Sequence, residues 1–129
     1  MVHAEGKTYD FLPESAIEAE ILETFPYEGE RQLIRYETKE FSAVCPFSGL
    51  PDYARIVIEY IPEIKIIELK SLKYYIGSYR QVGIYQEHAT NRLFADLWRV
   101  IDPQYLKIET QYNTRGGIDA ICMIEKGNR

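Results

Sequence analysis

The stretch "YARIVIEYIPEIKIIELKSLKYYIGSY", residues 53–79, has two different hydrophobic periods, one on each side of Pro62. Residues 53–61 alternate between apolar and polar, and this predicts a strand, one face of which is Ala54, Ile56, Ile58 and Tyr60. From Leu69 on, the apolar residues recur at helical spacing, and this predicts a helix that Gly83 ends. The apolar stripe of this helix is Leu69, Leu72, Ile76 and Tyr79. Because both periods occur in one short stretch, we expect a fold that mixes strands and helices.

Similar patterns on either side of this stretch bring the number of main elements to six. They are strands 31–41 and 53–61, helices from Leu69 and from about Gln86 to Val100, and strands 105–112 and 118–125, with 113–117 as a hairpin turn. The order ββααββ predicts an α+β domain in which two helices cover one face of a four-stranded antiparallel sheet. Such a small sheet has exposed edges, which pairing between neighbouring subunits in a ring would cover.

The chain of 129 residues is long enough for its own core, so we treat residues 1–129 as a single domain. The hydrophobic pattern says least about the structure of the first 30 residues. The apolar residues between Pro13 and Pro26 have helical spacing, which predicts a short helix; they are Ile17, Ile21, Leu22 and Phe25.

The composition is that of an ordinary globular protein, with 46% hydrophobic and 27% charged residues. A net charge of −5, without a basic cluster longer than a pair, argues against direct binding to nucleic acid. No apolar run approaches the roughly 20 residues of a membrane span. The N-terminus has charges where a signal peptide has its apolar core, so we expect a cytoplasmic protein.

Several common cofactor and metal motifs are absent from the sequence. It has no G-x-G-x-x-G fingerprint, no Walker loop, no C-x-x-C pair and no H-E-x-x-H motif. Any nucleotide cofactor is therefore held without a dinucleotide-binding fold. With two histidines and two cysteines in all, the chain disfavours a disulfide framework and a zinc site, and we expect no metal ligands.

The turn "FSAVCPFSGLPDYA", residues 41–54, contains a cysteine and an aspartate that can meet in one pocket. Pro46 favours an extended backbone at Cys45, and Gly49 can adopt a positive φ. If the two side chains meet, Asp52 can take the thiol proton and return it to a group that Cys45 attacks, which suits addition to a carbon–heteroatom multiple bond. The alternative is that Cys45 is a small packing residue and Asp52 caps a turn.

Two lysines lie at the start of the first predicted helix. Lys70 and Lys73 are spaced i, i+3 and share one side, so their ammonium groups, beside the helix N–H donors, predict a phosphate site. The alternative is a solvated helix face. Arg80 and Arg115, the latter beside the flexible Gly116, are weaker candidates for the same anion.

The second predicted helix starts with "QEH", residues 86–88. The carboxylate of Glu87 can accept paired N–H donors from a guanine-like ring, as acidic side chains do from exposed base amines. The alternative is that Glu87 only complements the helix dipole. His88 can carry a proton, or it can be an ordinary exposed histidine.

Together these stretches resemble the 7-cyano-7-deazaguanine reductase family, the nitrile reductases of queuosine biosynthesis. The family signature E-[SL]-K-[SA]-hydrophobic-K-[LY]-aromatic is met in full by "ELKSLKYY" at 68–75, and the turn CP-x-[ST]-G-x-PD by Cys45–Asp52. Smaller matches are "IP" at 61–62, "SYR" at 78–80, "DP" at 102–103 and "RGG" at 115–117. The resemblance extends from about Phe41 to Gly117 and fits the short, single-domain form.

The resemblance implies a tunnelling fold assembled as pentameric rings, typically stacked as a decamer, with sites at subunit boundaries. It implies that Cys45 adds to the nitrile carbon to form a covalent thioimide and that Asp52 is the proton donor. It also implies that two NADPH molecules deliver hydrides in succession. The product would be 7-aminomethyl-7-deazaguanine, a precursor in tRNA modification. Substrate contacts are expected from Glu68, Ser71, Gln86, Glu87 and His88, and NADPH contacts from Lys70, Lys73, Arg80, Arg115 and Gly116.

One departure from the family concerns Gln86. The family often has a histidine directly before the glutamate, whereas this chain has Gln86 before Glu87 and His88 after it. Gln86 can still form a hydrogen bond to the substrate, but a proton relay through a histidine at that position is in doubt.

Rival functions share parts of this pattern. An amidinotransferase relative would use the same Cys45–Asp52 pair to add ammonia to nitrile-bearing tRNA, but it lacks the NADPH signature that residues 68–75 meet. A non-catalytic purine-binding module would keep Glu87 and have no use for the Cys45–Asp52 pair. A pterin-type enzyme such as GTP cyclohydrolase needs zinc ligands that these few cysteines and histidines cannot supply.

Overall fold

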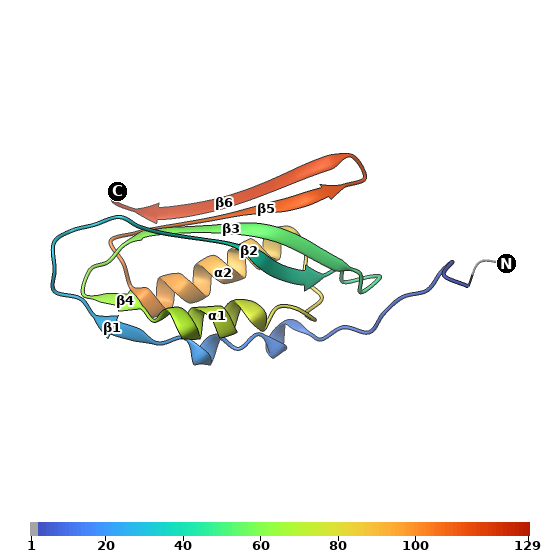
Figure 1. Cartoon of the computed structure of the whole chain (residues 1–129), viewed down its shortest axis with the longest axis horizontal. Helices are drawn as coiled ribbons and strands as arrows, with labels where there is room; N and C mark the ends of the chain where they lie inside the picture. The colour runs from blue at the N-terminus through green and yellow to red at the C-terminus, as the bar shows by residue number, and fades with distance from the viewer. Residues whose placement is uncertain (1–2) are drawn as a thin grey trace.

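The structure, a computed structural model, describes residues 3–129. Figure 1 shows a four-stranded antiparallel sheet with two helices on one face. The strands of this sheet are β2 (Ile34–Val44), β3 (Pro51–Ile61), β5 (Tyr105–Arg115) and β6 (Ile118–Gly127), and the helices are α1 (Leu69–Gly77) and α2 (Gln86–Ile101). The predicted α+β class and the order ββααββ are therefore confirmed.

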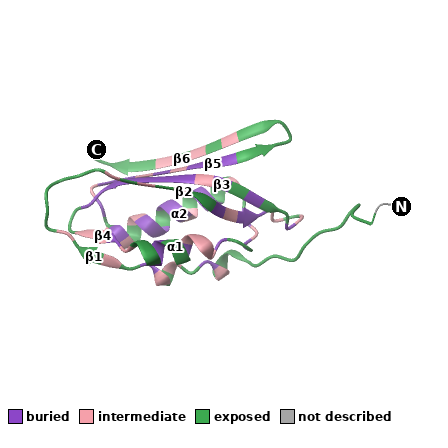
Figure 2. Ribbon diagram, viewed as in Figure 1, coloured by how far each residue is buried: buried purple, intermediate pink, exposed green. Residues whose placement is uncertain are grey.

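The core lies between the sheet and the helices. The sheet has the order β2-β3-β5-β6, and the predicted face of β3 (Ala54, Ile56, Ile58 and Tyr60) is buried there. Figure 2 shows the same division, with buried residues where β3 and β5 face α2. Helix α2 contributes Leu93 and Leu97, both with no exposed surface. Burial of this apolar surface is the main force that holds the helices on the sheet.

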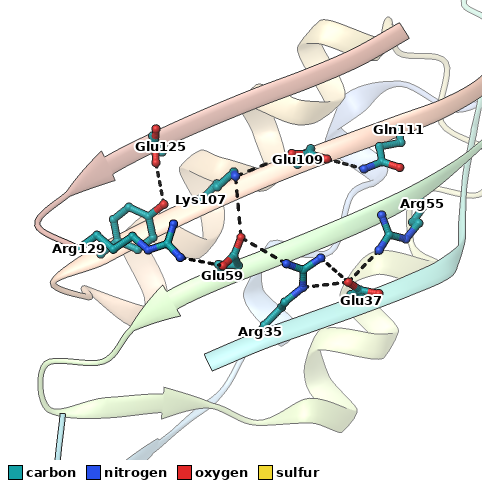
Figure 3. A network of polar contacts seen from close by, with 10 residues as sticks. Arg35, Glu37, Arg55, Glu59, Lys107, Glu109, Gln111, Glu125 and Arg129 are labelled. Carbon is teal, nitrogen blue, oxygen red and sulfur yellow. Dashed lines mark hydrogen bonds and ion pairs between the residues drawn. The ribbon is translucent and has the colours of Figure 1, made fainter. Parts of the chain in front are cut away.

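The opposite face of the sheet carries a network of charged side chains (Figure 3). Glu59 lies at its centre, 5% exposed, and within 3.9 Å of three cationic groups. Alternation along each strand produces this division, since residues that do not face the core all point to this side. The network residues labelled in Figure 3 are Arg35, Glu37, Arg55, Glu59, Lys107, Glu109, Gln111, Glu125 and Arg129.

Helix α1 is shorter than predicted, and the predicted stripe is confirmed in part: Leu72 and Tyr79 are buried, but Leu69 is not. The helix ends at Gly77, and Gly83 lies in the connection to α2. Leu69 is 54% exposed, whereas Tyr75, outside the predicted stripe, has no exposed surface. The carboxylate of Glu68 caps the helix by accepting the N–H groups of residues 70 and 71. This cap fixes where the helix starts and leaves Leu69, in its first turn, facing solvent.

The prediction of a helix between Pro13 and Pro26 is wrong. The segment forms two single 3₁₀ turns, Glu14–Ala16 and Ala19–Ile21, and then strand β1 (Thr24–Pro26). Ile17, between the turns, has an extended backbone, with φ −67° and ψ 128°.

Tertiary hydrogen bonds replace the helix in this segment. The N–H groups of Glu18 and Glu23 donate to the hydroxyls of Ser78 and Ser71, at 3.0 Å each. Strand β1 pairs antiparallel with β4 (Lys65–Ile67) in a second, two-stranded sheet that the sequence did not predict. Several backbone N–H donors of this segment therefore find their acceptors in other parts of the chain, which a local periodicity cannot indicate.

Strand boundaries differ from prediction at the two hairpin ends. The first strand lies at Ile34–Val44, shifted by three residues from 31–41, and has a register shift between Thr38 and Phe41. The second hairpin closes through Gly116 and Gly117, both with positive φ, so β5 extends to Arg115. In the part of the chain that the structure describes, no helix has the length and apolar character needed to cross a membrane.

Replacing Asp96 by alanine is expected to lower the free energy of unfolding by about 2–3 kcal/mol. Asp96 is buried between the helices and accepts hydrogen bonds from the Tyr75 hydroxyl and from Arg92 Nε, both at 2.7 Å. Burial raises the pKa of Tyr75, so its hydroxyl keeps its proton and donates. Urea unfolding followed by circular dichroism measures the loss. The exposed Glu63→Ala is the control, and equal stability of the two variants would contradict this role of Asp96.

Candidate functional site

The Cys45 loop is the connection between β2 and β3. Its base is the paired end of the hairpin, where Val44 lies opposite Pro51 and Ala43 opposite Asp52. The N–H of Cys45 donates to the carbonyl of Leu50 and that of Gly49 to the carbonyl of Cys45, both at 2.9 Å. The register thus places Cys45 just beyond the last strand pair and Asp52 beside it.

The connection that leads into α2 is hydrogen-bonded to the same hairpin end. The N–H of Val44 donates to the carbonyl of Val82 at 3.0 Å, and the N–H of Ile84 donates to the carbonyl of Val44 at 3.2 Å. Gln86 and Glu87, the first residues of α2, follow two positions later. The backbone therefore brings the predicted nucleophile and the predicted substrate anchor to one place.

A cavity of about 290 Å³ lies where these segments meet. This volume is close to the lower end of small-molecule pockets in proteins. The cavity contains five of the residues singled out from the sequence: Cys45, Asp52, Gln86, Glu87 and Arg115. Pro46, Ile84 and Tyr85 complete the lining.

Asp52 is 5% exposed and forms an ion pair with Arg115, between Oδ1 and Nη1. Arg115 reaches it from the end of β5, next to the glycine turn. The contact lacks hydrogen-bond geometry: among the described residues, Asp52 Oδ1 and the Tyr112 hydroxyl are the buried side-chain atoms without a hydrogen-bond partner. An ion pair with Arg115 thus holds the Asp52 carboxylate in the lining of the cavity that Cys45 also lines.

The loop around Cys45 favours the thiolate. Backbone N–H groups of Ser48 and then Phe47 lower the pKa of the thiol, partial burial opposes them, and the nearby charge of Arg115 adds to the lowering. Thiolate is the nucleophilic form of cysteine, so this environment suits a residue that attacks a carbon centre.

Alkylation of Cys45 by iodoacetamide is expected to reach half its maximal rate at a pH below the ordinary range of a cysteine thiol. The lowered pKa means that the thiolate is already formed at lower pH, where a free thiol is still protonated. Peptide mass spectrometry of samples quenched across a pH series measures the midpoint, with free glutathione as the reference. A midpoint at or above that of the reference would contradict the assignment.

The lysines of the signature border a different cavity. Lys70 and Lys73 line a larger cleft of about 810 Å³ between α1 and the edge strand β2. The expectation that α1 offers free N–H donors beside them is wrong for residues 70 and 71, because these N–H groups donate to Glu68. A phosphate at this position would therefore be held by the ammonium groups and would have to avoid the carboxylate of Glu68.

The remaining candidates do not line the Cys45 cavity within one chain. The hydroxyl of Ser71 is buried, donates to the carbonyl of Glu68 and accepts from Glu23. His88 is exposed, and its ring lies 5.7 Å from that of Tyr85. Arg80 donates to the carbonyl of Gly77, and Gly116 lies in the β5–β6 turn.

Two features of the site were not found from the sequence. Tyr85 lines the cavity directly before the Gln86–Glu87 pair, and its adjacency to that pair was an available signal. The other is a buried hydroxyl pair, Thr90 and Thr110, at 2.6 Å. Because Thr90 also donates to the carbonyl of Gln86, Thr110 must donate to Thr90, and the pair ties the first turn of α2 to β5.

Comparison with known proteins shows which family the chain resembles. The family model described as "QueF-like protein" matches residues 51–129. A protein of Thermotoga petrophila named NADPH-dependent 7-cyano-7-deazaguanine reductase is 51% identical over 92% of this chain and 87% of its own length. A protein of the same name from Caldicellulosiruptor bescii is 46% identical over 88% of each chain.

A solved structure is also similar. The crystal structure of the archaeosine synthase QueF-Like in the apo form has a TM-score of 0.71 and 25% identity, over 78% of this chain and 99% of that one. The predicted tunnelling fold agrees with this match and with the ββααββ sheet. The family model covers more than half of the chain and the relatives match most of it, so the chain belongs to the QueF-like protein family.

Proposed function

We propose that this protein reduces the nitrile of 7-cyano-7-deazaguanine to an aminomethyl group with NADPH. The observation that carries the proposal is the cavity that contains Cys45, Asp52 and Glu87 together, a nucleophile, a proton donor and an anchor for a purine-like edge. Relatives at 46–51% identity bear the name of this reductase, whereas the archaeosine synthase structure is 25% identical. The reductase is therefore favoured over ammonia addition to tRNA.

The proposed first step is addition of Cys45 across the nitrile. The thiolate sulfur bonds to the nitrile carbon, one π bond of the nitrile breaks, and the nitrogen takes a proton from Asp52, which received it from the thiol. The product is a thioimide on Cys45. The loop favours the thiolate, and the cavity keeps Asp52 buried beside it, so both groups are held ready for this step.

NADPH supplies a hydride to the substrate carbon in each of two successive rounds. The residues of this chain have different roles in these rounds: Cys45 leaves, and regains its proton, when the first reduced adduct collapses to an imine, and Asp52 passes to the nitrogen the two protons that the reductions consume, which it takes up from solvent. Glu87 and Gln86, at the start of α2, would hold the ring by accepting and donating hydrogen bonds along its edge.

The cleft beside α1 fits a phosphate-bearing cofactor. It is large, and its rim has two exposed ammonium groups, Lys70 and Lys73, one helical turn apart. Ammonium groups bind phosphate by charge-assisted hydrogen bonds. Arg80 and Arg115, the other candidates for the cofactor's phosphates, do not line this cleft within one chain, and Arg115 lines the Cys45 cavity instead.

Replacing Lys70 and Lys73 together by alanine is expected to raise the KM for NADPH about 10- to 100-fold and to change the KM for the nitrile little. The reason is that the two ammonium groups would bind the phosphates of the cofactor and not the substrate ring. Steady-state kinetics with each reactant varied in turn measures the split. Lys7→Ala, an exposed lysine away from both cavities, is the control. An unchanged KM for NADPH would show that the two lysines do not bind the cofactor and only form a solvated helix face.

We also infer that the complete site forms between subunits of a ring. Glu68, Ser71 and the two lysines of α1 do not share the Cys45 cavity within one chain. In the described part of the chain, β2 and β6 each pair on one side only, so both edges can accept a neighbour. β6 also exposes three apolar residues, Ile118, Ile121 and Met123.

Light scattering on the eluting protein tests the assembly. The family arrangement of two stacked pentamers would have a mass about ten times 15.1 kDa, and a single ring about five times. A monomer in solution at working concentration would contradict a site built between subunits.

The function itself is tested by NADPH oxidation with the free nitrile base. We expect two NADPH consumed for each nitrile and an aminomethyl product in the mass spectrum. A parallel reaction offers ammonia and nitrile-bearing tRNA without NADPH. Product in that reaction, with no NADPH oxidation in the first, would overturn the reductase in favour of the amidinotransferase.

A further inference from the structure

The segment Tyr9–Leu12, here called the N-terminal strap, lies against the connection between α1 and α2. The N–H of Leu12 donates to the carbonyl of Gln81 at 2.7 Å, and the N–H of Gly83 donates to the carbonyl of Leu12 at 2.9 Å. Leu12 and Val82 form an isolated parallel bridge. The strap is therefore hydrogen-bonded as a short extra strand to the segment that leads into α2.

The same strap reaches the Cys45 loop at its other end. The N–H of Tyr9 donates to the carbonyl of Ser48 at 2.7 Å. Gly49, beside Ser48, has φ +72°, and a Cβ there would lie 2.3 Å from the carbonyl oxygen of Tyr9. The strap thus contacts both loops that carry the site, one near Cys45 and the other near Gln86.

Gly83 shows how tightly the strap fits. A Cβ at Gly83 would lie 2.2 Å from Cδ2 of the Phe11 ring. The φ of Gly83 is not in the positive range, so its backbone conformation does not require glycine. The close approach of Phe11 is therefore what favours glycine at this position.

The connection 81–84 lies between the strap and the end of β2. On one side Gly83 is bonded to Leu12, and on the other Val44 forms an isolated parallel bridge with the same glycine. Cys45 directly follows Val44, and Gln86 follows Ile84 by two residues. The position of the nucleophile relative to the start of α2 thus depends on a segment that the strap holds from outside.

We propose that the N-terminal strap is a positioning element for the Cys45 cavity, which holds the Cys45 loop and the start of α2 at the separation that the reaction needs. The kinetic part of this proposal rests on the proposed nitrile reduction. The side chains of the strap are not part of the buried core, since Tyr9, Phe11 and Leu12 are 57%, 39% and 45% exposed. Loosening the strap therefore removes less buried apolar surface than a core substitution does, and we expect its effect on activity to exceed its effect on stability.

Three full-length variants test the strap: Phe11→Ala, Gly83→Ala and the double variant. The alanine at residue 83 displaces the Phe11 ring, so each single change should release the same contact. We expect every variant to form the Cys45 adduct with the nitrile about tenfold more slowly, with no further loss in the double variant. Phe25→Ala, a comparably exposed phenylalanine on β1, should react at the parent rate.

A second measurement does not depend on the reaction. Hydrogen exchange at the amide of residue 83, which donates to Leu12, and at the amide of Val44, which donates to Val82, should become at least about tenfold faster in the variants. Amides in the middle of β3 and β5 should keep their protection, and the melting temperature should stay near that of Phe25→Ala.

The outcomes separate the proposals. Parent adduct rates and parent exchange at both amides in all variants would overturn the strap. Losses that simply add in the double variant, or faster exchange throughout the sheet, would overturn it as well, because they would show a general loss of structure. If the unmodified protein forms no adduct at all, the proposed function fails, while exchange at Gly83 and Val44 still decides whether the strap holds the loops.

Discussion

Replacing Cys45 by alanine is expected to lower the rate of nitrile reduction by a factor on the order of 10⁴ or more and to abolish the covalent adduct. Without the sulfur no thioimide forms, and hydride would have to reach a nitrile that has not been activated. The cavity around residue 45 loses only the sulfur atom, so purine-like ligands should still bind. Intact-protein mass spectrometry with the nitrile detects the adduct, and NADPH oxidation measures the rate.

Cys122→Ala is the matched control for this experiment. Cys122 is the other cysteine of the chain; it lies on β6 opposite Thr110 and does not line the Cys45 cavity. The control should keep the parent rate and gain the mass of the substrate on one site. An adduct of normal yield in Cys45→Ala would show that Cys45 is not the nucleophile, whatever the overall rate.

The second large effect is expected for Asp52→Asn, which should lower kcat by about 10²–10⁴. An amide of the same shape fills the site but cannot pass a proton from the thiol to the nitrile nitrogen. The KM for NADPH should change little, because Asp52 lies in the cavity of Cys45 and not in the cleft beside Lys70. Pre-steady-state measurement of adduct formation should show that this first step is slowed.

Asp102→Asn is the control for the aspartate. Asp102 has a left-handed backbone at the end of α2, a conformation that asparagine also tolerates, and it lies outside both cavities. A fully active Asp52→Asn would reject the proton-donor role. Loss of activity with unchanged adduct formation would place the residue in a later step of the reaction.

Arg115 affects how the Asp52 result is interpreted. Its guanidinium forms an ion pair with Asp52, so the asparagine variant also leaves a cation without its partner. Arg115 is substantially exposed and can turn to solvent, which limits the cost of that loss. The expected change is therefore in the chemical step and not in the stability of the fold.

The short-range hydrophobic pattern was enough to predict the four long strands and the two α-helices. The period of two in 53–61 placed Ala54, Ile56 and Ile58 in the core, and the helical period in 86–100 placed Leu93 and Leu97 there. Both periods depend only on neighbouring residues, since side-chain direction repeats every two residues in a strand and every 3.6 in a helix. The pairing of Cys45 with Asp52 was equally local, because a hairpin loop brings its two ends together.

Particular hydrogen bonds, some of them between distant segments, decided what the hydrophobic pattern could not. The segment after Pro13 has helical spacing, yet its backbone donors at Glu18 and Glu23 are met by serines of α1 and its end about 50 to 60 residues away. Leu69 has the spacing of a core residue, yet the Glu68 cap leaves it in solvent. In both places hydrogen bonds to particular partners outweighed a weak local preference.

Local sequence pattern was sufficient for the ββααββ order and for the buried faces of β3 and α2, and it showed that a cysteine and an aspartate of one turn could meet. Which candidates share a cavity followed from the folded chain alone: folding brought Arg115 and Glu87 to Cys45, and it left Lys70 and Lys73 at a separate cleft. The N-terminal strap likewise came only from the folded chain. The physical reason is that periodicity reports the direction of each side chain within its own element, whereas a site depends on how separate elements are packed and hydrogen-bonded.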